Sequence, residues 1–121
     1  LVREAGSATT AAGPDVYVLH QGGATQRHAF GLAERLRDAG LDVVLHAGEA
    51  SLKSQMKRAD ASGAEYAVIV GATEAQQGAA AVKALRSADA AEPFAEQRIV
   101  PLPDIPARLV DALTRNDTAD D

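Results

Sequence analysis

The chain has 121 residues, a length that suits one domain built around a single hydrophobic core. Its net charge of -5 argues against a nonspecific nucleic-acid binder, and its lack of cysteine excludes disulfides, thiolate metal ligands and cysteine nucleophiles. Because no apolar stretch approaches the roughly 20 residues of a membrane span and no signal peptide is evident, we predict a cytoplasmic protein.

The N-terminal part of the chain predicts alternating strands and helices. Residues 1–14 lack hydrophobic periodicity and are interpreted as a linker, which, with no initial methionine, suggests a piece of a longer protein. VYVLH (16–20) is a short apolar run of strand-forming residues ended by glycines. ATQRHAFGLAERLRDAG (24–40) shows the apolar spacing of a helix with a glycine cap, and DVVLHAG (42–48) repeats the strand pattern.

A cationic helix followed by a strongly apolar strand is predicted next. Ser51 is a good N-cap, because its hydroxyl can accept a hydrogen bond from a free amide of the first turn, and Ser62 and Gly63 supply the end. YAVIVG (66–71) is apolar enough for a strand that is covered on both faces. The predicted buried face of the helix consists of Leu52, Met56 and Ala59.

The lengths of the connections predict the sheet. Three strands joined by two helices should run parallel through right-handed crossovers. Only ATEAQQG (72–78) separates the third strand from AAAVKAL (79–85), the predicted fourth strand. Because a parallel return needs about a dozen residues, the fourth strand should run antiparallel. RIVPL (98–102) predicts a fifth strand and DIPARLVDALTR (104–115) a closing helix, with a frayed acidic tail over 114–121. The elements predict a mixed five-stranded sheet with three main helices.

Glycine turns follow the predicted parallel strands, at the place where open α/β sheets bind ligands. His20 and His46 lie there without the carboxylate partner or ligand spacing of an acid–base or metal site, so they are interpreted as ordinary strand-end histidines. The glycines match neither the dinucleotide fingerprint nor the phosphate loop, and Gln21 and Gly71 stand where a phosphorelay receiver needs acidic residues. We expect a binding module with no catalytic residue, no metal site and no cofactor of its own.

Charge is unevenly distributed along the chain. Residues 51–87 carry five basic and three acidic side chains, a local charge of +2, whereas the remainder carries seven basic and fourteen acidic residues. A cationic surface on an acidic body suits selective contact with an anion. Ordinary solvated lysines would give the same pattern.

SLKSQMKRADASGAEYAVIVG (51–71) resembles the helix–strand signature of the C-terminal anticodon-binding domain of bacterial histidyl-tRNA synthetases. DVYVLHQGG, AFGLAERLRDAGLDVVLH and EAQQG before VKAL are similar to the same family in order and spacing, so the resemblance covers residues 15–113. The alanines that open the fourth strand depart from the bulkier residues expected there. The resemblance implies three α/β/α layers and the strand order 2-1-3-4-5.

By this resemblance, the module grips the anticodon loop of histidine tRNA for an enzyme that attaches histidine with ATP and Mg²⁺. The longer enzyme would be a cytoplasmic homodimer with its catalytic domain in the same chain. Because the class II catalytic motifs are absent here, the chain alone should not aminoacylate tRNA. An alternative is a protein-interaction or accessory-subunit module that reuses the fold, and a third interpretation is a small-nucleotide binder at the strand ends.

The residues expected to contact RNA come from two sources. Related synthetases suggest the link between the third and fourth strands and the start of the fourth strand. The strand-end rule adds the end of the first strand and the second helix. Lysines would hold phosphates while amide and carboxylate side chains read base edges. The predicted contact residues are Glu74, Gln76, Gln77, Gly78 and Lys83 from the first source, and Gln21, Gly22, Ser51, Lys53, Gln55 and Lys57 from the second.

Overall fold

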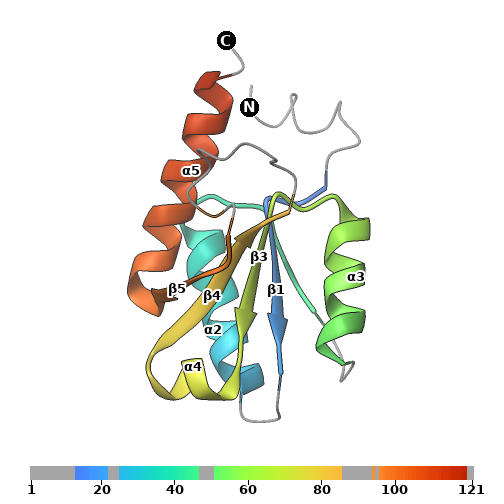
Figure 1. Cartoon of the computed structure of the whole chain (residues 1–121). Coiled ribbons are helices and arrows are strands. Elements are labelled where there is room, and N and C mark those ends of the chain that lie inside the picture. Colours follow the sequence, from blue (N-terminus) through green and yellow to red (C-terminus); the bar gives the residue numbers. More distant parts are fainter. Residues whose placement is uncertain (1–12, 22–24, 47–50, 86–93, 95, 120–121) are drawn as a thin grey trace.

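Five strands form one mixed sheet in the computed structural model, which describes residues 13–21, 25–46, 51–85, 94 and 96–119 (Figure 1). The spatial order is β2-β1-β3-β4-β5, with β1 parallel to β2 and β3, and β4 antiparallel to both of its neighbours. The predicted strand order and the antiparallel fourth strand are confirmed. The strands are β1 (Val16–His20), β2 (Val43–Leu45), β3 (Tyr66–Val70), β4 (Ala79–Ala84) and β5 (Arg98–Pro101).

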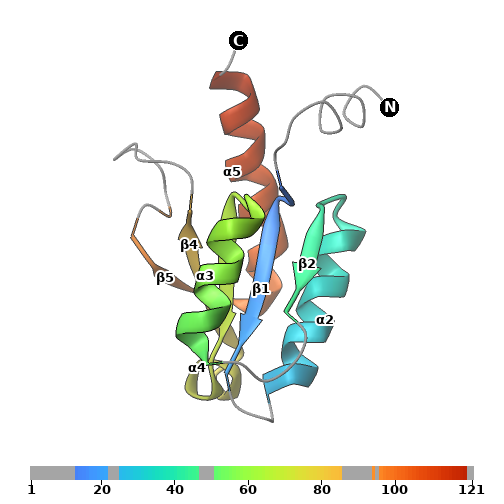
Figure 2. The ribbon, with the colours of Figure 1, turned by 90° about the vertical axis from the view of Figure 1, so that its right-hand side faces the viewer.

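Helices cover both faces of the sheet and give the predicted three layers. Figures 1 and 2 show α2 (Thr25–Asp38) and α5 (Ile105–Ala119) on one face and α3 (Leu52–Ser62) on the other. A short 3-10 helix, η1 (Leu102–Asp104), leads from β5 into α5. Within the described part of the chain, no helix combines the length and the apolar character needed to cross a membrane.

Two segments are more helical than the sequence predicts. The link between β3 and β4, expected to be a loop, contains the short helix α4 (Ala72–Gln76). Helix α5 continues to Ala119, beyond residue 114, where the sequence predicts the start of a frayed tail. No glycine or proline follows Pro106 in the sequence, so no residue type interrupts the hydrogen bonding of this helix.

The sheet face beneath α2 and α5 carries the larger hydrophobic cluster. Leu36 of α2 and Leu109 of α5 are fully buried in it, together with valines from the central strands. Tyr66 packs edge-on against Phe94, with ring centroids 5.9 Å apart and an interplanar angle of 87°. This layer therefore buries the larger share of the apolar side chains that stabilise the fold.

Helix α3 covers the opposite face with a smaller cluster. Of its predicted buried face, Ala59 is fully buried, whereas Leu52 and Met56 are partly buried and pack at the margin. Gln55 is buried beside them, and Tyr17 brings a hydroxyl into the same layer. The α3 layer thus mixes polar groups with its apolar contacts.

The ends of the long helices follow the predicted capping. Ser51 Oγ accepts a hydrogen bond from the main-chain N of Ser54 at 3.2 Å, and Gly63 ends α3 with a φ of 85°. Gly40 follows α2 with a φ of 94°, and Leu41 packs against the core just beyond it. Both glycines adopt the left-handed conformation that a side chain would strain.

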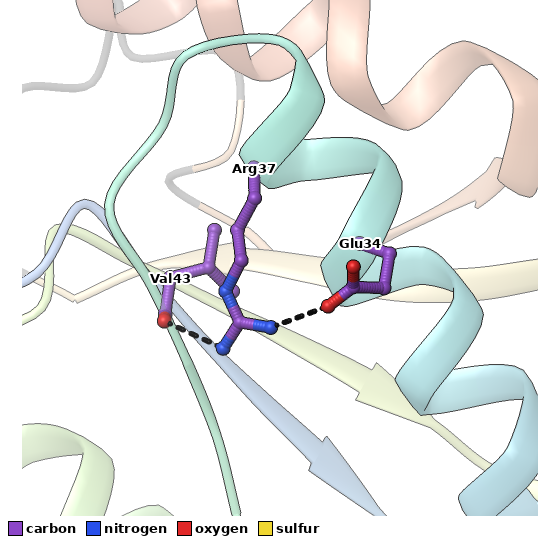
Figure 3. A network of polar contacts seen from close by, with 3 residues as sticks. All are labelled: Glu34, Arg37 and Val43. Carbon is purple, nitrogen blue, oxygen red and sulfur yellow. Dashed lines mark hydrogen bonds and ion pairs between the residues drawn. The ribbon is translucent and has the colours of Figure 1, made fainter.

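A polar contact ties α2 to strand β2 (Figure 3). Arg37 Nη1 donates to Glu34 Oε2 at 2.8 Å, and Arg37 Nη2 donates to the main-chain O of Val43 at 3.1 Å. The two charged side chains are 42% and 50% exposed. Because water screens such a pair, its main effect is to orient Arg37 toward β2.

Candidate nucleic-acid interface

The carboxyl ends of β1 and β3 meet at one end of the sheet, beside the start of α3 and the short helix α4. Figure 1 shows these elements together at the lower end of the view. The N-terminus of α3 points to this end, and a helix N-terminus favours anionic groups. Most of the predicted contact residues gather here. We call them the sheet-end surface, which consists of Gln21, Ser51, Lys53, Glu74, Gln76, Gln77 and Gly78.

Amide side chains are the exposed part of this surface. Gln21 directly follows β1, and its main-chain N donates to the main-chain O of Val70 in β3 at 3.1 Å. The backbone is therefore held in place while the side chain is exposed. Gln76 and Gln77 are exposed at the end of α4, and Gly78 turns the chain into β4 with a φ of 70°. Gly22, also predicted, lies outside the described residues.

Glu74 lies over the carboxyl end of β3. A Cβ built on Gly71, the residue before α4, would collide with Glu74 Oε1, so the carboxylate lies directly against this glycine. Glu74 is partly buried in the first turn of α4. A carboxylate held at this position can accept hydrogen bonds from base amino groups, and Gly71 leaves the space that it occupies.

The exposed lysines of α3 lie away from strand β2. Arg58 acts electrostatically on His46, the residue after β2, so its side of α3 faces that strand. At about 100° per residue, Lys53 lies on the opposite flank, nearer β3 and β4. Lys57 follows one turn later and is also exposed. Lys53 therefore lies on the β3 side of the sheet-end surface, whereas Lys57, two residues after the buried Gln55, points away from the sheet.

Lys83 lies apart from the sheet-end surface, which corrects its placement at the start of the fourth strand. It is the fifth residue of β4, opposite Ala67, and at about 3.3 Å per residue it lies about 13 Å from Ala79. Lys83 shares a sheet face with Ala81, which belongs to the cluster on the α3 side. Figure 2 shows β4 and β5 extending beyond the cover of α3. Ile99, opposite Ala81, is 52% exposed there. We call Lys83 and Ile99 the open sheet face.

Gln55 has a different task from the predicted RNA contact. Its side chain is 1% exposed, with Oε1 accepting from the main-chain N of His20 at 3.0 Å. Its Nε2 donates to the main-chain O of the same residue at 2.7 Å. Both ends of the amide are therefore bonded to β1, which corrects the prediction that this side chain contacts RNA directly.

The two strand-end histidines form a buried polar cluster with Tyr17. The Tyr17 hydroxyl shares a hydrogen bond of 3.0 Å with His46 Nδ1, and His20 Nε2 donates to the main-chain O of His46 at 3.1 Å. Burial lowers the pKa of His46 below its ordinary value of 6.5, and the nearby His20 and Arg58 lower it further. Among the described residues, His46 Nε2 is a buried side-chain nitrogen without a hydrogen-bond partner.

These histidines do not form a metal site with their described neighbours. Over the residues that the structure describes, no three His, Asp, Glu or Cys side chains are close enough together to hold a metal ion. Both histidine residues are 5% exposed, so they lie beneath the surface that a large ligand would touch. Their geometry fits packing between α3 and the strand ends.

Sequence reasoning missed the exposure of Ile99 and the burial of Gln55. For Ile99 the signal was the alternation in RIVPL, since Val100 is buried and its neighbour must face the other side of β5. For Gln55 it was the position between Leu52 and Ala59 on the apolar stripe. An exposed apolar side chain is thus added to the surface beside Lys83, and one predicted contact residue lies beneath the surface.

Comparisons with known proteins agree with this geometry. A family model described as "Anticodon binding domain" matches residues 15–99. The histidine–tRNA ligase of Cupriavidus pinatubonensis is 53% identical over 117 residues, which make up 93% of this chain and 26% of that protein. The histidine–tRNA ligase of Paraburkholderia phymatum is 55% identical over 105 residues, 84% of this chain and 24% of the relative. The chain therefore spans about a quarter of the length of these relatives.

Solved structures show the same fold. Histidyl-tRNA synthetase from Nostoc sp. PCC 7120 superposes with a TM-score of 0.72 at 29% identity, over 86% of this chain and 23% of that chain. The RNA-binding domain of threonyl-tRNA synthetase from Cryptosporidium parvum superposes with a TM-score of 0.70, over 85% of this chain and 24% of that chain. At 14% identity, the second likeness concerns the fold alone.

Proposed function

Because this chain belongs to the family of anticodon-binding domains, we propose that it binds the anticodon loop of histidine tRNA. The observation that carries the proposal is the 53% identity to a histidine–tRNA ligase across nearly the whole chain. The sheet-end surface supports it, since exposed amides, a carboxylate and lysines suit the splayed bases and phosphates of a single-stranded loop.

We propose further that the chain works within a longer enzyme that attaches histidine to this tRNA. In that enzyme the catalytic domain of the same chain would use ATP with Mg²⁺, and two copies would form a cytoplasmic homodimer. Charging would then reside outside these 121 residues. An aminoacylation assay tests whether charging requires the rest of the enzyme. The chain alone should give no histidyl-tRNA, and product formation would contradict the proposal.

At the sheet-end surface and its surroundings, we assign phosphate binding and base recognition to different side chains. Lys53 and Lys57 are exposed cations at a helix whose N-terminus faces the site, so they hold phosphates. Glu74 and Gln77 lie where β3 passes into β4, and their acceptors and donors can distinguish base edges. Lys83 belongs to the open sheet face and would meet RNA that extends beyond the sheet end.

Binding measurements with anticodon stem-loops separate these two roles. Lys53→Ala or Lys57→Ala should weaken all stem-loops about equally and lower the salt slope by up to about one, because fewer counterions are released. Arg108→Ala, which removes an exposed charge from α5 on the other face, is the matched control and should leave both quantities unchanged. The isolated chain should bind weakly, with Kd roughly 10⁻⁴ to 10⁻⁶ M.

Glu74→Ala and Gln77→Ala should instead narrow the gap between the cognate stem-loop and one with an altered anticodon. The expected loss is about 1–3 kcal/mol of discrimination where a bidentate contact is removed. If these variants keep the cognate preference while Lys53→Ala abolishes it, the assignment of reading and holding is reversed. Chemical-shift changes that avoid residues 51–57 and 72–83 altogether would refute the surface.

A further inference from the structure

The hydrogen-bond ladder between β1 and β2 stops one step earlier than its register allows. Val16 N donates to Asp42 O at 3.1 Å, and His46 N donates to Val18 O at 2.9 Å. The same two-residue step would next join the main-chain N of His20 to the main-chain O of His46. Each of these two groups bonds to a side chain instead.

Two side chains take the place of the missing step. The His20 ring donates to the main-chain O of His46, and the Gln55 amide bonds both the N and the O of His20. One side-chain amide that offers a carbonyl and an N–H to one residue takes the place of the two main-chain groups, from successive peptide units, that a continued parallel strand would offer. The Gln55 side chain of α3 thus makes the hydrogen bonds to β1 that a neighbouring strand would make.

The two hydrogen bonds of Gln55 hold α3 against the carboxyl end of β1. Gln55 lies one turn after Ser51 in α3, and His20 directly precedes Gln21. The β1 side of the sheet-end surface and its α3 side are therefore joined by two hydrogen bonds that are shielded from water.

We propose that Gln55 is a positioning residue for RNA binding, which holds Gln21 and the start of α3 in the relative orientation that the anticodon loop requires. The inference rests on the proposed function for its ligand. It predicts that Gln55 contributes to affinity without touching RNA, because a pre-ordered surface loses less freedom when it binds.

Two variants of the 121-residue chain test the proposal against a histidine anticodon stem-loop. Gln55→Met removes both hydrogen bonds, and Gln55→Glu keeps an acceptor but places a carboxylate against the His20 carbonyl. Each should weaken binding about tenfold, and the salt slope of the uncharged Gln55→Met should stay unchanged because no phosphate contact is lost. Leu113→Ala, a partly buried position in α5 on the other face, is the stability control and should bind within about twofold of the wild type.

Protonation supplies a second test, because it restores a hydrogen-bond donor at position 55. As the pH falls from about 7.5 to about 5.5, the buried carboxylate introduced by Gln55→Glu takes up a proton and can donate to His20 again. The affinity of Gln55→Glu relative to wild type should then recover, whereas that of Gln55→Met should stay low. If Gln55→Met does not fold, this recovery by Gln55→Glu carries the test alone.

The proposal is overturned if folded Gln55→Met binds within about twofold of the wild type, or if Leu113→Ala loses as much affinity. A wild-type chain that does not prefer the cognate stem-loop would instead defeat the proposed function. In that case amide hydrogen exchange still tests whether Gln55 holds the end of β1 in place. The Gln21 amide should exchange faster in Gln55→Met than in Leu113→Ala. Equal exchange in the two variants would refute it.

Discussion

The two faces of the sheet do different work with different side chains. Under α2 and α5 the face is closed by aliphatic residues and the Tyr66–Phe94 pair. Under α3 the cluster is small, contains buried hydroxyl, imidazole and amide groups, and leaves β4 and β5 partly uncovered (Figure 2). The sheet therefore separates a well-packed apolar layer from a layer in which polar groups are buried beside the sheet end.

The largest expected effect comes from truncating one side chain on each face of the sheet. Leu36→Ala removes a fully buried side chain from the α2 layer and should lower the free energy of unfolding by about 2–5 kcal/mol. Met56→Ala removes a partly buried side chain from α3 and should cost no more than about 1–2 kcal/mol. Urea unfolding measures both, and equal losses would break the contrast.

A pH series sharpens the contrast from the α3 side. The pKa of His46 is lowered in the folded chain, so below about pH 6.5 the unfolded chain takes up a proton that the folded chain resists. Stability should therefore fall with pH below that value, until the lowered pKa is reached, and His46 should have no such effect above it.

His46→Gln isolates this contribution, because glutamine does not titrate. The variant should lose less stability than the wild type between about pH 7.5 and about pH 5.5 in urea unfolding. His28→Gln, at an exposed position of α2, is the matched control and should follow the wild-type curve. If His28→Gln flattens the curve as much as His46→Gln, the buried cluster is not the acid-sensitive part of the fold.

The smallest effect is expected at the exposed margin of the well-packed face. Arg37→Ala removes the Glu34 ion pair and the bond to the Val43 carbonyl, and should cost about 0.5–1 kcal/mol, since water replaces both contacts. Glu34→Ala leaves the Val43 bond in place and should cost still less. A loss near that of Leu36→Ala would show that α2 depends on this contact more than on its buried side chains.

The fold could be predicted largely because connection length and local pattern act together. VYVLH and YAVIV are buried throughout, as their runs of apolar residues predict, and the short link after Val70 forces β4 to return antiparallel. The alanine-rich fourth strand also forms at its predicted start, because its pairing to β3 and β5 replaces the weak strand preference of alanine.

The site was harder to predict, because burial and register depend on the whole assembly. Sequence spacing places Gln55 on α3, but only the docked helix shows that its amide bonds the main-chain N and O of His20, as a neighbouring strand would. Lys83 was assigned to the sheet end, yet the antiparallel direction of β4 carries it to the other end of the sheet. Side chains at helix and strand ends are therefore identified by sequence as candidates, while their task follows from tertiary contacts.

The edges of the sheet have a consequence for how copies of this chain behave when concentrated. β2 has only three residues, and Arg37 occupies the main-chain O of Val43. At the opposite margin, β5 has four residues and ends at Pro101, which has no N–H to offer a foreign strand. A strand from a neighbouring molecule would find little length to pair with on either side, so the domain resists edge-to-edge aggregation while its apolar Ile99 stays exposed.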